Sequence, residues 1–274
     1  MKKRACYWCW MLLLGNLLSS NLWSQLPVIL EKAHAHNDYD KPWPALHTAL
    51  NKGFRSIEVD VYPYQGQLKV AHWPFALGAA ADLEALYLRP LDSLWKAESP
   101  WLSKSTPLIL MIDIKRQGGI AQELLEKLCR RYAHLLCSFT KDSTHAAPVQ
   151  VLLSGQYDWE HTQQQIPHYW QLDGRWHHLE SSNQLVPRIS QPYRGSFSWK
   201  GQGEQPEVER QLLDSLVQRA HAVGKTLRFW GVPNNTGLWK AFKRAGVDWI
   251  QVDDLKAYEL FYNKKTLEKI RGKK

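Results

Sequence analysis

Acidic and imidazole side chains stand at the ends of several short apolar runs in this sequence. In chain order these ends are His34-Ala-His36, Glu58-Val-Asp60, His72 and Asp113-Ile-Lys115. Three carboxylates brought together would repel and desolvate one another, and a bound divalent cation relieves both penalties. Mg²⁺ and Ca²⁺ prefer carboxylate oxygens, which leaves imidazoles free to transfer protons near neutral pH. The residue types therefore favour metal-assisted acid–base chemistry.

Strand periodicity places these side chains on common faces. In an extended strand, residues two apart point to the same side. Glu58 and Asp60 therefore share one face, and Asp113 and Lys115 share another. A second interpretation of Glu58 and Asp60, as charges at a strand end held by Lys or Arg, stays open at this point.

Short β-rich runs alternate with amphipathic helical patterns through most of the chain. The predicted strands cover residues 28–36, 55–61, 68–72, 108–114, 149–153, 226–231 and 249–252, and residues 155–203 show no clean period. Strands alternating with helices over ~250 residues are typical of a TIM-type (β/α)8 barrel. We therefore predict an α/β fold with a single-domain barrel, in which the strand ends form the active face.

Later strands and two helices complete this prediction. The later strands end in Ser154, Trp230 and Asp253, which we expect to line the pocket, although barrel packing suits Trp230 equally well. Two helical stripes predict buried faces: Ile120, Leu124, Leu125, Leu128, Tyr132 and Leu135, and then Val208, Leu212, Leu216, Val217 and Val223. Gly224 follows the second stripe and suits a helix C-terminus.

The first 24 residues have the order of a secretory signal peptide. Lys2, Lys3 and Arg4 precede an apolar stretch at 11–18 and a polar, small-residue segment at 19–24. A retained anchor is the alternative. We expect a mature chain of residues 25–274, secreted or periplasmic, without a membrane span.

The net charge of the mature chain bears on its partners. Loss of three basic residues lowers the net charge from +9 to +6, which favours anionic small molecules as partners. No Lys/Arg cluster follows one helix, so nucleic acid is not the expected partner.

Several motifs resemble one known superfamily. Ala35-His-Asn37, Ile57-Glu-Val-Asp-Val61, Gln65-Gly-Gln-Leu-Lys-Val-Ala-His72 and Met111-Ile-Asp-Ile-Lys115 resemble the signature of the glycerophosphodiester phosphodiesterase and phosphatidylinositol phospholipase C-like barrels. His34-Ala-His-Asn-Asp-Tyr39 is most similar to the branch named after altered inheritance of mitochondria protein six. The resemblance implies hydrolysis of a small-molecule or lipid-derived phosphodiester.

The resemblance also implies roles for single residues. Glu58, Asp60 and Asp113 would hold Mg²⁺ or Ca²⁺, His36 and His72 would be the general acid and base, and Lys115 would neutralise phosphoryl oxygens. Three positions depart from the superfamily pattern. Asn37 stands where many relatives have Arg, so as a substrate-binding residue it would make that phosphate contact more weakly or differently. Gln65 replaces an Asp, and Trp73 replaces an Asp after the second histidine. These departures leave the acid–base pair intact but bear on which alcohols the substrate carries.

Two other functions fit parts of the sequence. His34-Ala-His36 is also the opening of amidohydrolase-like metal hydrolases, in which both histidines would be ligands. These enzymes need histidines at the ends of middle strands, and the strand at 149–153 ends in Ser154 instead. A non-catalytic barrel that binds a ligand is the remaining alternative, and it would normally show a broken metal set.

Overall fold

The computed structural model describes residues 28–41, 44–140, 142–164 and 167–271. The predicted signal peptide at 1–24 lies outside these residues. Within the described part of the chain, no helix has the length and apolarity needed to cross a bilayer.

Eight strands, each parallel to its neighbours, close into a barrel because β1 pairs with both β2 and β11. Around the barrel the strands are β1 Ala33–His36, β2 Ser56–Tyr64, β4 Leu108–Ile114, β7 Val149–Gly155, β8 Trp170–Gly174, β9 Arg188–Pro192, β10 Thr226–Trp230 and β11 Trp249–Val252. This topology confirms the predicted (β/α)8 barrel.

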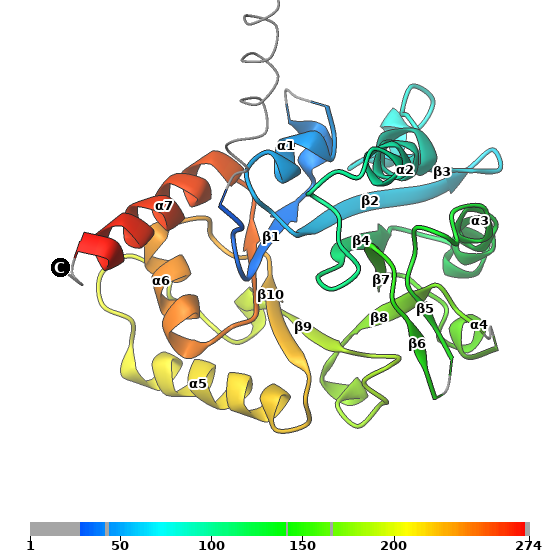
Figure 1. Ribbon diagram of the computed structural model, residues 1–274. Coiled ribbons are helices and arrows are strands. Elements are labelled where there is room, and N and C mark those ends of the chain that lie inside the picture. The colour runs from blue at the N-terminus through cyan, green and yellow to red at the C-terminus, as the bar shows by residue number, and fades with distance from the viewer. Residues whose placement is uncertain (1–27, 42–43, 141, 165–166, 272–274) are drawn as a thin grey trace, which may run out of the picture.

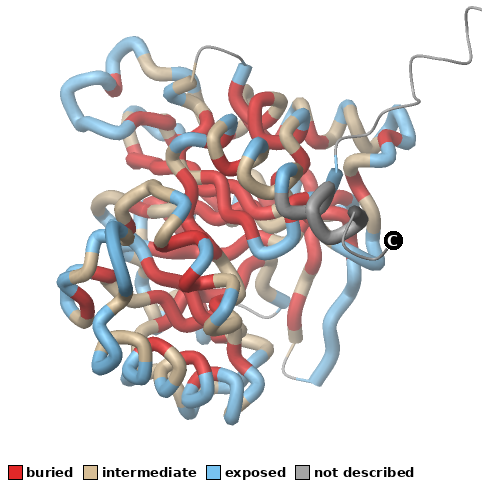
Figure 2. Tube along the Cα trace, turned by 90° about the vertical axis from the view of Figure 1, so that its left-hand side faces the viewer, coloured by how far each residue is buried: buried red, intermediate tan, exposed pale blue. Residues whose placement is uncertain are grey.

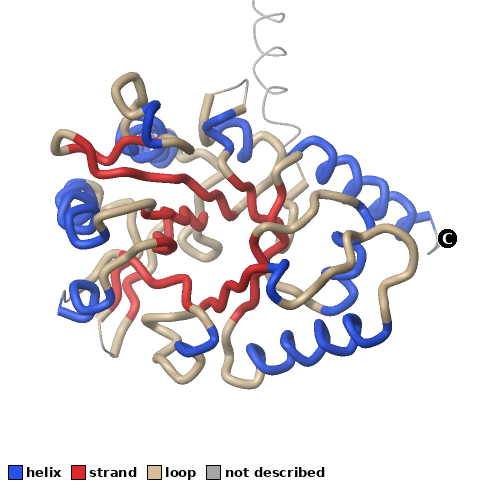
Figure 3. Tube along the Cα trace, turned by 180° about the vertical axis from the view of Figure 1, so that it is seen from behind, coloured by secondary structure: helices blue, strands red, loops and turns tan. Residues whose placement is uncertain are grey.

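Helices surround the strands on the outside (Figures 1 and 3). They are α1 His47–Leu50, α2 Arg89–Lys96, α3 Gly118–Arg131, α4 Trp159–Gln164, α5 Glu207–His221, α6 Thr236–Ala245 and α7 Leu255–Arg271. The ends of α6 follow from local sequence: the Asn235 side chain accepts from the backbone N–H groups of Gly237 and Leu238, and Gly246 ends the helix at a φ of 86°.

The strands are buried on both faces, for different reasons. On β2, Ile57, Val59 and Val61 belong to the main hydrophobic cluster. Ser56, Glu58 and Asp60 alternate with them and are also buried. Since adjacent side chains of a strand point to opposite faces, the polar set lies inside the barrel. Figure 2 shows the strands as the buried centre of the molecule.

The third predicted strand is real, but it is not a barrel strand. β3 (Gln67–Val70) runs antiparallel to β2, with Val61 opposite Val70. Gln65 and Gly66 both have positive φ, as a tight two-residue hairpin turn requires. The hairpin returns the chain to the level of Asp60, where the Ala71 N–H donates to the Asp60 carbonyl at 3.3 Å. His72 therefore reaches the barrel mouth just after the antiparallel strand β3. The prediction that His72 ends a barrel strand was wrong.

Two barrel strands lie in the stretch without a clean period. β8 and β9 fall between residues 155 and 203 and carry inward polar residues, among them Asp173, Arg188 and Ser190. A separate short hairpin joins β5 (Ser138–Phe139) and β6 (Thr144–His145).

Candidate functional site

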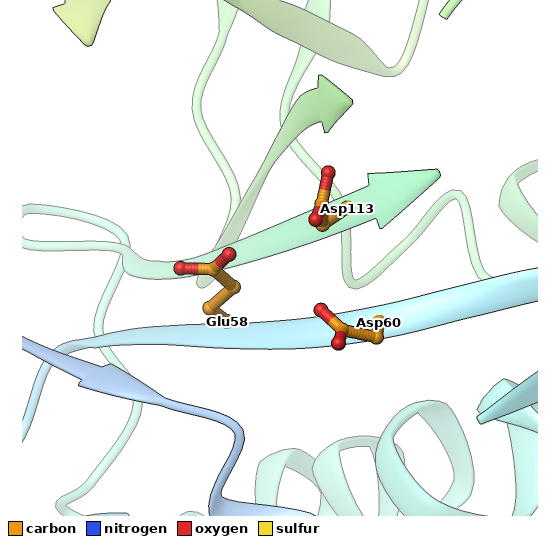
Figure 4. A group of neighbouring side chains, drawn as sticks. All are labelled: Glu58, Asp60 and Asp113. Carbon is orange, nitrogen blue, oxygen red and sulfur yellow. The ribbon is translucent and has the colours of Figure 1, made fainter. Parts of the chain in front are cut away.

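Three carboxylates from two neighbouring strands point toward one another at the barrel mouth. Glu58 and Asp60 come from β2, Asp113 comes from β4, and the register pairs Asp60 with Asp113 (Figure 4). One oxygen of each carboxylate lies within 4.8 Å of the others. In the described part of the chain, no other group of three or more His, Cys, Asp or Glu side chains is spaced this way. The fold thus brings the three predicted metal ligands together.

The spacing of these oxygens fits a hard divalent cation. Oxygen ligands lie ~2.0–2.6 Å from Mg²⁺ or Ca²⁺, so two oxygens on one ion are at most about 4–5 Å apart. Burial, and then the negative charge of Glu58, raises the pKa of Asp113. Lys115 supplies part of the missing positive charge, since its Nζ lies 3.0 Å from Asp60 Oδ1 and donates to Asp113. The donor set has the chemistry that such an ion requires.

Glu58 is held from inside the barrel by two residues. Its Oε2 accepts from Arg228 and lies 2.9 Å from His34 Nε2. Burial raises the pKa of Glu58, but the guanidinium of Arg228 and the hydrogen bond from His34 lower it by more, so the pKa lies well below its usual range. Glu58 is therefore an ionised carboxylate in a buried position.

His34 is a neutral interior residue. Burial and the charge of Arg228 lower the pKa of His34 to about 3. An ionised Glu58 can only accept, so Nε2 of His34 carries the proton and Nδ1 accepts from Ser56 Oγ at 2.7 Å. His34 is fully buried, as expected for an inner-layer residue beneath His36.

His36 pairs with the carboxylate of Asp253, which directly follows the last barrel strand, β11. Its Nδ1 lies 2.6 Å from Asp253 Oδ1, and Asn234 fixes Asp253 by donating to Oδ2 and accepting from its backbone N–H. Burial lowers the pKa of His36, but the hydrogen bond to Asp253 and the charge of Glu58 raise it by more. Because Nδ1 is engaged by Asp253, Nε2 is the nitrogen of His36 that can contact a ligand in the cavity that His36 lines.

His72 contacts the same acidic group from the hairpin side. Its Nδ1 lies 3.1 Å from Asp60 Oδ2, and its side chain is 44% exposed. The Asn37 amide donates to the same oxygen at 3.1 Å. Both predicted acid–base histidines are thus tied to a carboxylate through Nδ1.

A cavity of about 350 Å³ is lined by two of the three carboxylates, Glu58 and Asp113. Its lining is rich in cations, with Lys115, Arg175 and Arg228, which suits an anionic ligand. The other lining residues are His36, Glu58, Asp113, Ser154, Gly155, Trp230, Gly231 and Gln251. We call this space the reaction cavity.

The four predicted substrate-binding residues take different positions. Ser154 and Trp230 line the reaction cavity. The Asn37 side chain is buried against Asp60, and Asp253 holds His36, so each of these two is placed to orient another site residue. Asn37 has a φ of 50°, a left-handed conformation that asparagine tolerates better than most residues.

Two arginines of the reaction cavity, Arg175 and Arg228, were not predicted from the sequence. Arg228 lies two residues before Trp230 on β10, so strand periodicity alone would have placed it on the same face. Arg175 follows β8 in the stretch without a clean period, and no sequence signal pointed to it.

The amidohydrolase-like alternative is not supported. His34 is engaged by Ser56 and Glu58, and neither His34 nor His36 belongs to the carboxylate cluster. The Lys and Arg alternative for Glu58 and Asp60 is correct in part, because Arg228 and Lys115 do contact them. Those contacts leave all three carboxylates around one centre.

The fold is similar to that of a solved phosphodiesterase. The crystal structure of a glycerophosphodiester phosphodiesterase from Agrobacterium tumefaciens superposes with a TM-score of 0.53 at 14% identity, over 85% of this chain and 100% of that chain. The class of fold is therefore a TIM barrel. The chain belongs to the family of AIM6-like phosphodiesterase domains, whose model matches residues 25–169. As a member of that family it is a phosphoric diester hydrolase.

Two further relatives extend the similarity along the chain. Altered inheritance of mitochondria protein 6 from Eremothecium gossypii is 27% identical over 289 residues, covering 90% of this chain and 73% of that protein. A homologue of the same protein from Arthroderma benhamiae is 26% identical over 260 residues, covering 84% of this chain and 83% of that protein.

Proposed function

We propose that this phosphodiesterase hydrolyses a glycerophosphodiester-like or phospholipid-derived substrate at a divalent cation, Mg²⁺ or Ca²⁺, held by Glu58, Asp60 and Asp113. The observation that carries the proposal is the convergence of these carboxylates within 4.8 Å, beside two histidines that each pair with a carboxylate. When bound, the cation would neutralise charge on the phosphoryl oxygens and orient them.

The protein's own residues would perform the proton transfers. His36 and His72 are the proposed general acid and base: one takes the proton of the attacking oxygen, and the other donates a proton to the departing alkoxide. Asp253 keeps His36 oriented and favours its protonated form. Lys115 is proposed to stabilise negative charge on the phosphorus oxygens, because burial lowers its pKa but Asp113 and Asp60 raise it by more.

The reaction type can be tested with three chromogenic esters. A phosphodiester such as bis(p-nitrophenyl) phosphate should be hydrolysed, whereas p-nitrophenyl phosphate and p-nitrophenyl acetate should not exceed the rate without enzyme. Preferential hydrolysis of the monoester or of the acetate would contradict the proposed acid–base site. The same assay on His36→Ala assigns any activity to this cavity.

We also propose that the chain is exported and loses residues 1–24, since the order of the basic, apolar and polar segments supports a signal peptide. Intact-mass measurement of protein recovered from the periplasm or medium tests this. A mass that still includes Met1 to Ser24 would indicate a retained anchor.

A further inference from the structure

A second cavity of about 1000 Å³ adjoins the reaction cavity. Its walls come from the loops after β9 and β10, which lie at the same end of the barrel as the carboxylates. Trp230 and Gly231 line both cavities, so the two spaces share a wall. We call this second space the side groove.

Most of the surface of the side groove is apolar, although the cations Arg194 and Lys200 also line it. Tyr193 and Phe197 stack at 5.0 Å between ring centroids, and the Tyr193 hydroxyl is already used, since it donates to the Trp199 carbonyl at 2.6 Å. Val232 adds an aliphatic surface, and Trp230 is 41% exposed where the two cavities meet. No side chain that lines the groove, all of them within the described residues, has a buried polar atom without a partner. The charged groups of the lining, Arg194 and Lys200, are exposed and can stay in solvent while the apolar walls take up a ligand.

The loop that forms one wall is fixed to two helices. The backbone N–H groups of Ser198 and Trp199 donate to Glu209 of α5 at 3.0 and 3.1 Å. The Asn235 amide, at the start of α6, donates to the Lys200 carbonyl at 2.7 Å. Because these hydrogen bonds are made within the protein, ordering of this wall should add little to the entropic cost of binding a ligand.

The two cavities differ in the chemistry that they can recognise. The reaction cavity is small and charged, and it has room for a phosphate with a compact polar alcohol. The side groove is about three times larger and mostly apolar, and it shares Trp230 and Gly231 with the reaction cavity. We propose that the side groove binds a hydrocarbon chain on one alcohol of the phosphodiester, so that the substrate is a single-chain lipid phosphodiester. The inference rests on the proposed hydrolysis at the carboxylate cluster.

Binding of alkyl monophosphates tests the groove without catalysis. Methyl, butyl and octyl phosphate, kept below their aggregation limits, would be titrated calorimetrically into the full chain with Mg²⁺ or Ca²⁺. Each methylene that leaves water contributes at most ~4-fold in affinity. We expect octyl phosphate to bind at least ~10-fold more tightly than methyl phosphate. Equal affinity across the series would overturn the proposal.

A matched pair of variants locates the effect. Ser198→Trp adds bulk at the groove wall and also removes the hydrogen bond from Ser198 Oγ to Glu209, and it should remove most of the gain from methyl to octyl phosphate. Gln202→Trp adds the same bulk to an exposed position of the same loop, outside the groove, and should keep the gain. A gain that survives in Ser198→Trp would place the chain elsewhere and overturn the assignment.

Kinetics separates this inference from the proposed function. Glycerophosphocholine and an eight-carbon lysophosphatidylcholine differ only in the acyl chain, and we expect kcat/KM to be at least ~10-fold higher for the second, through KM. Equal kcat/KM values would overturn the groove assignment alone. If neither diester reacts with any metal, the proposed hydrolysis of such substrates fails, and the alkyl phosphate titration still decides the groove.

Discussion

Nε2 of His34 lies 2.9 Å from Oε2 of Glu58, inside the barrel and shielded from solvent. Two residues further along β1, His36 instead pairs with Asp253 and lines the reaction cavity. Both side chains leave the same face of one strand, and depth alone separates them. The arrangement gives His34 a supporting contact with a proposed metal ligand and places His36 at the reaction cavity.

This division predicts different losses for three histidine variants. His36→Ala and His72→Ala should each lower kcat by ~100-fold or more, a typical share for general acid–base catalysis, with metal affinity largely kept. His34→Ala should leave more kcat at saturating metal but weaken metal affinity by ~10-fold or more, since it loosens Glu58. Metal titrations alongside kcat measure both effects. Loss of metal in both His34→Ala and His36→Ala would instead indicate an amidohydrolase-like ligand pair.

Replacing Asp253 should change the pH dependence of the reaction. The hydrogen bond to Asp253 raises the pKa of His36, so Asp253→Asn should lower it. The limb of the kcat/KM profile that reports His36 then moves to lower pH. Asp254→Asn is the control, because Asn can still accept from the Ala257 N–H. A uniform fall in rate with no movement of either limb would mean that Asp253 acts in another way.

Breaking the contact between Arg228 and Glu58 should be costly. Both side chains are buried, and removing one partner of a buried ion pair typically costs about 3–5 kcal/mol. We expect Arg228→Met to lower the free energy of unfolding by that order in urea titrations. The double variant Arg228→Met/Glu58→Gln should recover part of the loss, because no uncompensated charge then remains. Purely additive losses would show that the pair is not coupled.

Asp38 makes stability depend on pH in an unusual direction. Burial, only partly offset by the Tyr87 hydroxyl, raises the pKa of Asp38 from 3.8 to about 6. A raised folded-state pKa gives stability that is complete below pH ~4 and is lost as the pH rises through about 6. Asp38→Asn should therefore become more stable relative to the wild type between pH 4.5 and 7.5. Urea unfolding at several pH values checks this, and a constant difference would contradict it.

Much of the site could be predicted because strand periodicity is strict. Glu58, Asp60 and Asp113 follow from residues two apart on apolar strands and from the rule that barrel strands end on one face. His72 could be predicted as a site residue. The antiparallel strand that leads to it could not be predicted, since such a strand and a barrel strand share the same short apolar pattern. The turn at Gln65 and Gly66 was the available signal.

Other features depend on tertiary contacts that periodicity does not contain. Ile120 and Val208 begin the two predicted apolar stripes, but they are 52% and 77% exposed, while Leu213 and Ala220 are buried. The way in which each helix packs on the barrel decides which of its faces is buried. The buried face is therefore displaced by about one residue from the predicted stripe, as for Leu213 in place of Leu212. The strands at 170–174 and 188–192 were missed because a barrel interior with Asp173 and Arg188 does not look apolar in sequence.

The most direct test of the central claim is the loss and recovery of hydrolysis as metal is removed and returned. Purified mature protein would be treated with EDTA, freed of chelator, and assayed with bis(p-nitrophenyl) phosphate while Mg²⁺ or Ca²⁺ is titrated back. We predict no hydrolysis without metal, full recovery with one ion per chain, and no bound ion in Asp113→Asn at the same concentration. Full activity of metal-free protein would contradict the account.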